Sequence, residues 1–217
     1  MGIENIESNK KEFIELLKEV GSLREGSDID GLIAWLEEHG FFVSPATTQY
    51  HHSEEGGLCK HSLEVYHNLL SLYEKFSLSI VNKDTLIILG LLHDIIRCTI
   101  YEPSVVNVKT YCENGKNVDN LGRFIWEAKK VFKVKKDDTR VSYGNYNFDN
   151  YYTVATFIPL TDSETSALIS QANSNTARES EQFIALKDRN VLFLQIADLL
   201  SSYLTNESTD LKNELPF

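Results

Sequence analysis

Cysteine is scarce in this 217-residue chain, and the three cysteines form no pattern. Their number is odd, and Cys59, Cys98 and Cys112 show no paired spacing, which argues against a disulfide framework. The first residues are polar and lack the apolar core of a signal peptide, so a reducing cytoplasm is the expected location. The longest apolar run, residues 85–92, is far shorter than the ~20 residues that a membrane helix needs.

Basic residues are also in the minority. The chain has 21 Lys and Arg against 32 Asp and Glu, a formal net charge of -11. Such a chain is poorly suited to binding long nucleic acid through its phosphates, so a small ligand in a pocket is the expected partner. The hydrophobic fraction of 42% is ordinary for a globular protein, and the length allows one large domain.

Helical periodicity dominates the sequence. Apolar residues at i, i+3, i+4 and i+7 predict helices over about residues 13–20, 29–36, 58–76, 82–96, 161–171 and 187–204. Ser27 or Asp28 is expected to cap the second helix and Asn82 the fourth, while Gly40 ends the second. We expect an irregular loop over 41–57.

The helical pattern weakens between residues 101 and 140. Residues 104–112 alternate as a strand does, and Asn114-Gly115 is a turn signal. The segments 124–128 and 130–136 fit either a small hairpin or a short helix. We therefore predict a mainly α single domain with an irregular or β-hairpin insertion around 101–140. An N-terminal helical extension would occupy 1–40, the core 41–205 and a tail 206–217.

Four polar residues interrupt otherwise apolar helices. His93 and Asp94 break the run IILGLLHDIIR, Asp198 lies within FLQIADLLSSY, and His61 follows a glycine pair. A buried polar group without a partner costs several kcal/mol. One divalent transition metal (Mn, Fe, Co, Ni or Zn) bound by all four would satisfy them together. Taken singly, each histidine has the simpler explanation of an ordinary hydrogen bond, and each aspartate that of a cap for another segment.

Three segments resemble the signature segments of the HD phosphohydrolase superfamily. They are HHSEEGGLCKHSLEVY, LGLLHDIIR and LQIADLLSSYL, in that order. The resemblance extends over residues 41–204 and implies an HD-type helical bundle that cleaves phosphate esters with a metal. It implies that His61, His93, Asp94 and Asp198 are the metal ligands.

The sequence departs from related proteins of the superfamily at two kinds of position. Two-metal members have two further histidines between the HD pair and the final Asp, where this chain has Asn145 and Gln171. Since no histidine follows His93, one metal is expected at most. Single-metal members often have a Glu where Arg97 stands. Arginine is no general base, but its fork can hold a phosphate; the alternative is that Arg97 caps a helix or pairs with Glu102.

Three weaker candidates surround these residues. His52 and Lys60 are candidate substrate-binding residues, with a surface loop and a solvated lysine as the respective alternatives. Glu64, one turn from His61, either orients that ligand or faces water.

These observations lead to ranked hypotheses. The first is a metal-dependent phosphohydrolase acting on a small phosphorylated molecule, with a nucleotide favoured and with Asp94 and Arg97 as catalytic residues. The alternative is a catalytically degenerate HD-fold protein that binds a nucleotide or another protein. A plain helical structural domain ranks last, because it leaves the buried imidazoles and carboxylates unexplained.

Overall fold

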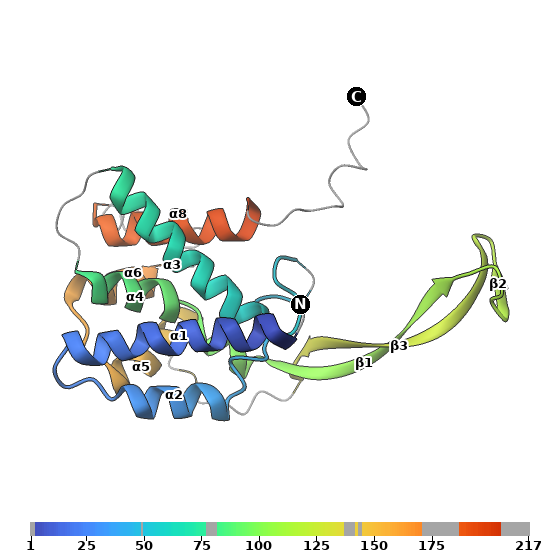
Figure 1. The fold of residues 1–217 in the computed structure, drawn as a ribbon, viewed down its shortest axis with the longest axis horizontal. Helices are drawn as coiled ribbons and strands as arrows, with labels where there is room; N and C mark the ends of the chain where they lie inside the picture. Colours follow the sequence, from blue (N-terminus) through green and yellow to red (C-terminus); the bar gives the residue numbers. More distant parts are fainter. Residues whose placement is uncertain are drawn as a thin grey trace.

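The computed structural model describes residues 3–48, 50–76, 82–136, 142, 145–170 and 187–204. The described helices are α1 Ile3–Leu23, α2 Ile29–Glu38, α3 Gly57–Lys75, α4 Lys83–Leu92, the 3-10 helix η1 Ile95–Thr99, α5 Tyr146–Phe157, α6 Asp162–Ser170 and α8 Arg189–Tyr203. The strands are β1 Tyr101–Tyr111, β2 Asn117–Asp119 and β3 Gly122–Val134. The prediction of a mainly α fold with a β-hairpin insertion is confirmed, as Figure 1 shows. None of the described helices combines the length and apolar character needed to span a bilayer.

Helix α4 lies at the centre of the helical body. Every residue from Asp84 to Leu92 is buried, as its nearly continuous apolar sequence predicts. Helix α4 packs closely on α3 at Gly90, where a Cβ atom would lie 2.5 Å from the Cα atom of Tyr66. Only glycine permits this approach. The crossing brings His61, near the start of α3, to the end of α4 where His93 stands.

The prediction that this helix continues to about residue 96 is wrong. Helix α4 ends at Leu92, His93 is its C-cap residue, and Asp94 leaves the helical region with a φ of -134°. The cause is Asn150, buried on α5: its amide donates to the Leu92 carbonyl (2.8 Å) and accepts from the Ile96 N–H (3.1 Å). These two bonds replace some of the backbone hydrogen bonds that are lost where the helix is interrupted. His93 and Asp94 therefore lie at a bend of the chain and not on one continuous helix.

Helix boundaries elsewhere follow local capping. Asp28, one of the two predicted candidates, caps α2 by accepting the Gly31 N–H (2.9 Å), and Gly40 follows with a φ of 71°. Asn145 caps α5 in the same way through Phe148 (2.9 Å). Asn82 precedes α4 as predicted but makes no side-chain capping bond. Gln171 and the predicted tail lie outside the described residues, so the proposed domain division stays a prediction.

The insertion is a β-ribbon that extends away from the helices (Figure 1). Strands β1 and β3 pair antiparallel from Tyr101–Val134 to Tyr111–Phe124, and β2 adds to β3 at the far end. The predicted strand and turn are confirmed, since the Gly115 N–H bonds to the Cys112 carbonyl (3.0 Å). Residues 124–134 form neither the separate small hairpin nor the short helix considered for them: they belong to the single strand β3, which pairs with β1.

A buried ionic cluster ties the first helix to two others. The Arg24 guanidinium donates to Asp84 on α4 (2.7 and 2.9 Å) and to Glu164 on α6 (2.6 and 2.8 Å). Thr85 adds a bond to Glu164 (2.6 Å). Every carboxylate in this cluster is thereby paired, which is what allows charges to lie in the interior.

Candidate metal centre

The four predicted ligands come together from three parts of the chain. His61, His93 and Asp94 are buried, and one donor atom of each lies within 4.8 Å of the others. The Nε2 atoms of His61 and His93 are 3.3 Å apart. Asp198, on α8, places its Oδ1 atom 3.1 Å from His61 Nε2, and its side chain is 29% exposed. The site is therefore more open beside Asp198 than the apolar sequence of α8 predicted.

The Nδ1 atom of His93 fixes the tautomer of that imidazole. It lies 2.9 Å from the Gly90 carbonyl oxygen, which only accepts, so Nδ1 carries the proton. Burial lowers the pKa of His93 and so favours the neutral ring. The Nε2 atom that faces His61 consequently presents a lone pair.

His61 is held in the same tautomer through a longer chain of bonds. Its Nδ1 atom lies 3.0 Å from Ser201 Oγ, and the Ser201 hydroxyl donates to Glu64 Oε2 (2.8 Å). Because the hydroxyl proton points to Glu64, Ser201 accepts from the imidazole. With Nδ1 protonated, His61 Nε2 can bind a cation. It lies 3.1 Å from an Asp198 carboxylate oxygen, which only accepts, so a cation bound between the two atoms would satisfy both.

This arrangement fits a metal ion. Two lone pairs 3.3 Å apart repel unless a cation binds both, and the carboxylates of Asp94 and Asp198 complete a mixed nitrogen and oxygen donor set. Two nitrogens that bind one ion at about 2.1 Å lie about 3.0–3.4 Å apart for bond angles of about 90–110°. The observed separation falls in that range.

Asp94 is held by two further side chains. Its Oδ2 accepts from Arg97 Nε (2.6 Å) and its Oδ1 from the Tyr146 hydroxyl (2.9 Å). Burial raises the pKa of this carboxyl, but the charge of Arg97, followed by the histidines, outweighs burial and leaves the pKa below its ordinary value. Asp94 is therefore ionised and oriented, as a metal ligand must be.

Arg97 pairs with one of the candidate ligands and not with Glu102. Glu102, the partner considered in the alternative explanation of Arg97, pairs with Lys133 (3.2 Å), and Arg97 pairs with Asp94 instead. A second guanidinium nitrogen donates to the Ala46 carbonyl (3.1 Å). The side chain is 31% exposed, so part of the guanidinium borders the site. Its phosphate-binding role stays a prediction.

His52 and Glu64 lie on the Nδ1 side of His61. His52 is buried, with Nε2 2.9 Å from Glu64 Oε2, the oxygen that also accepts from Ser201. Burial lowers the pKa of His52, but Glu54 and Glu64 together outweigh it and raise the pKa. Of the two explanations for Glu64, orienting the ligand agrees with these contacts. A substrate-binding role for His52 stays a prediction.

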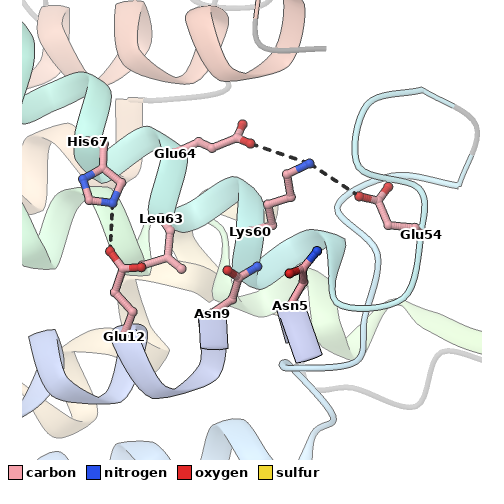
Figure 2. Close-up of a pocket in the computed structure, with 8 residues that line it drawn as sticks. All are labelled: Asn5, Asn9, Glu12, Glu54, Lys60, Leu63, Glu64 and His67. Carbon is pink, nitrogen blue, oxygen red and sulfur yellow. Dashed lines mark hydrogen bonds and ion pairs between the residues drawn. The ribbon is translucent and has the colours of Figure 1, made fainter. Parts of the chain in front are cut away.

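Lys60 lies apart from the four ligands. Its ammonium group is 3.8 Å from Glu54 and 3.9 Å from Glu64 and lines a hollow of about 530 Å³ beside α1 (Figure 2). The lining residues are Asn5, Asn9, Glu12, Glu54, Lys60, Leu63, Glu64 and His67. None of the four candidate ligands lines it, so the predicted contact of Lys60 with substrate has no support from its position.

Sequence reasoning missed three residues near the ligands. Tyr146 follows an irregular stretch without periodicity, and Ser201 is an ordinary polar residue by type. Ser201 stands three residues after Asp198 on the same helix face, and this spacing is the one signal in the sequence that pointed to Ser201. His51 stands beside His52 in the loop where related proteins place substrate-facing residues, but it was given no role of its own. Its ring lies 5.3 Å from that of His61, and burial, ahead of the neighbouring histidines, lowers its pKa to about 4.

Removing the anchor of His61 should weaken metal binding without abolishing it. We expect Ser201→Ala and Glu64→Gln to lower metal affinity by roughly 10–100-fold, the usual effect of losing a residue that orients a ligand. Affinity is measured by competition with a chromophoric chelator, and the His61 tautomer by 15N NMR. Ser71→Ala, at an exposed serine of α3, is the control. Unchanged affinity and tautomer in both variants would show that this chain of bonds does not position His61.

Comparison with known families agrees with this geometry. Residues 58–143 match the family model of the HD domain. The match includes His61, His93, Asp94 and Arg97, while Asp198 lies beyond it and joins the site through its contact with His61. No curated protein and no solved structure matches the chain. Residues 58–143 are therefore similar to the HD domain, which supports the predicted relation to the HD-type metal-dependent phosphohydrolases.

Proposed function

We propose that this protein is a single-metal phosphohydrolase that cleaves a phosphate ester of a small molecule, with nucleotides as the favoured substrates. The observation that carries the proposal is the pair of Nε2 lone pairs, on His61 and His93, that face each other beside Asp94. The Asp198 carboxylate lies 3.1 Å from His61 Nε2, so nitrogen and carboxylate donors converge on one point, the arrangement that a shared divalent cation satisfies.

The proposed ligands are His61, His93, Asp94 and Asp198. A divalent ion bound there would supply polarisation of a phosphoryl oxygen and a lower pKa for a coordinated water. One ion is proposed because all six histidines lie at or before position 93. Asn145, which stands where two-metal members have a histidine, has its side chain engaged as a helix cap.

The remaining residues have distinct proposed roles. Arg97 keeps Asp94 ionised and places positive charge at the border of the site, where a substrate phosphate needs neutralising. Tyr146 fixes the second oxygen of Asp94. His51 lies beside the ligands as a neutral imidazole at pH 7, because burial lowers its pKa to about 4.

One observation favours the alternative of a catalytically degenerate binding module. Arg97 occupies the position of the acid–base glutamate found in single-metal relatives, and its guanidinium is bound to a ligand. Under this alternative the protein retains nucleotide binding without turnover. The two functions differ in hydrolysis, not in ligand binding.

The deciding experiment is elemental analysis followed by a substrate panel. The full chain is purified without added chelator, and nucleoside monophosphates, triphosphates and cyclic diesters are incubated with it in Mn, Co or Ni. We expect one equivalent of transition metal and turnover of at least one nucleotide, both lost in Asp198→Ala. Metal and nucleotide binding without turnover would establish the alternative. Two bound metals would contradict the single-metal proposal.

Arg97→Lys separates phosphate recognition from metal binding. A lysine cannot reproduce the bonds to both Asp94 and the Ala46 carbonyl or offer a planar fork. We expect the affinity for a nucleotide to fall roughly 10–100-fold, the range for a charge-assisted hydrogen bond, with the metal retained. Isothermal titration with the nucleotide measures the loss. Arg123→Lys, the same change in the β-ribbon, should have no effect; equal affinities in both variants would leave Arg97 with no part in phosphate recognition.

A further inference from the structure

The β-ribbon has no function in the proposed metal site. Residues 101–136, called the arm below, comprise β1, β2 and β3 and extend away from the helices (Figure 1). We propose that the arm docks on the helical body of a second copy of this chain. Three observations support this partner: the charge of the arm, its exposed apolar side chains and its length.

The arm and the rest of the chain have opposite charge. Residues 101–136 hold eight Lys and Arg against four Asp and Glu, a formal charge of +4. The other residues consequently carry -15 of the total of -11. A basic arm on an acidic body is complementary to another molecule of the same kind, and such complementarity steers association.

Large apolar side chains gather on the arm. The exposed ones, with solvent-exposed fractions between 40% and 82%, are Val105, Val106, Tyr111, Val118, Leu121, Trp126 and Val134. The register places Trp126 opposite Lys109 and Tyr111 opposite Phe124 on one face. The other exposed apolar residues include Val106 and Val118, which the register places on the opposite face. An isolated ribbon of this kind is marginally stable in water, and exposed apolar side chains on both of its faces give it a surface that a partner can cover.

The chemistry of the arm favours a protein over nucleic acid. Lys109 is paired with Asp119 (2.5 Å) and lies over the Phe124 ring, and Lys133 is paired with Glu102 (3.2 Å). These pairs withdraw two of the eight cations from phosphate binding. Of the seven exposed apolar side chains, Tyr111 and Trp126 are aromatic, while the other five are valines and Leu121, which offer no stacking surface for bases but can pack against an apolar surface.

The dimensions of the arm suit a reciprocal pair. At about 3.4 Å per residue, an eleven-residue strand is about 37 Å long, slightly more than the about 31 Å of the 21-residue helix α1. Each arm is therefore long enough to lie along a helix of the partner as long as α1. An apolar hollow of about 350 Å³ at the root of the arm, lined by Val43, Val105 and Phe132 among others, offers a receiving surface for the tip of the other arm. A two-fold axis would make the two arm–body contacts identical, so the dimer would be closed and neither arm would be left free to bind a third copy.

The test is the oligomeric state of the full chain by sedimentation and light scattering. We expect twice the 24.7 kDa chain mass at micromolar concentration. Trp126→Glu and the double variant Lys129→Glu with Lys130→Glu, at two exposed lysines of β3, should each raise the dimer dissociation constant at least 10-fold. Trp126→Phe and the double variant Lys129→Arg with Lys130→Arg are the matched controls, because they change the same positions but keep the apolar side chain and the positive charges. Unchanged helical circular dichroism in each variant shows that the body is folded.

Two further measurements identify the partner surface. Rising salt should weaken the wild-type dimer, since screening removes the attraction between arm and body. Zero-length cross-linking of 14N-labelled with 15N-labelled chains should join arm lysines of one copy to body carboxylates of the other. A monomer at every concentration, or a dimer insensitive to the arm variants, would overturn the proposal. A monomer that binds RNA or DNA through the arm would likewise overturn it and give the arm a different partner.

Discussion

Asp94→Ala is expected to abolish turnover and to make thermal stability independent of metal. The substitution removes a ligand and leaves His61 and His93 with facing lone pairs. In the wild type, an ion present at 100 times its dissociation constant stabilises the fold by about 2.7 kcal/mol. For a chain of this size that corresponds to roughly 5–11 °C in melting temperature. Chelator should lower the wild-type melting temperature by that amount and scarcely change that of Asp94→Ala.

The control for this prediction is Asp30→Ala, at an exposed aspartate of α2. It makes the same chemical change far from the ligands and should retain both turnover and the chelator effect. Differential scanning fluorimetry with and without EDTA, on metal-loaded protein, measures all three proteins. Equal sensitivity to chelator in wild type and Asp94→Ala would mean that the stabilising metal binds elsewhere.

Arg24→Met is expected to cause the largest loss of stability. It leaves Asp84 and Glu164 without their cation, and the Glu164 side chain is fully buried while that of Asp84 is 10% exposed. Breaking a buried ion pair from one side costs about 3–5 kcal/mol. Urea denaturation measures the free energy of unfolding. Lys83→Met is the control, because Lys83 pairs with Glu19 between the same two helices α1 and α4 but at the surface, where a pair contributes about 0–1 kcal/mol.

The same cluster predicts the direction of the pH dependence. Burial raises the pKa of Glu164, but the bonds from Arg24 and Thr85 outweigh it and hold the pKa below the ordinary value of 4.5. A depressed carboxyl pKa stabilises the fold above the unfolded-state pKa, and that stability is lost as pH falls through the folded-state pKa. The difference in stability between wild type and Arg24→Met should therefore shrink below about pH 4. A difference that stays constant from pH 7 to pH 3 would contradict this origin.

The site was predictable where a polar residue stands out against its neighbours. His93, Asp94 and Asp198 interrupt apolar segments, and this contrast is visible in the sequence without knowledge of the fold. Ser201 and Tyr146 are no less close to the ligands, but each is a common polar residue whose partner lies far away in sequence. Their roles depend on tertiary contacts that no local pattern records.

The fold was likewise predictable only where the sequence pattern was local and clear. Periodicity located the helices, but it extended α4 too far because the bend after Leu92 depends on Asn150, which lies 58 residues away. Residues 124–136 contain β-branched, aromatic and basic residues with no clear period, so strand and helix were both compatible with them. Pairing with β1 across their length decided the outcome.

The close crossing at Gly90 has a consequence for the choice of ion. In the language of coordination chemistry, His61 and His93 form a chelate whose bite is set by the separation of α3 and α4. A methyl group at position 90 would have to push the Tyr66 backbone away by about an ångström. The bite would widen, and the site would then favour a larger cation over a smaller one. The metal preference of the proposed site would thus depend in part on a residue without a side chain.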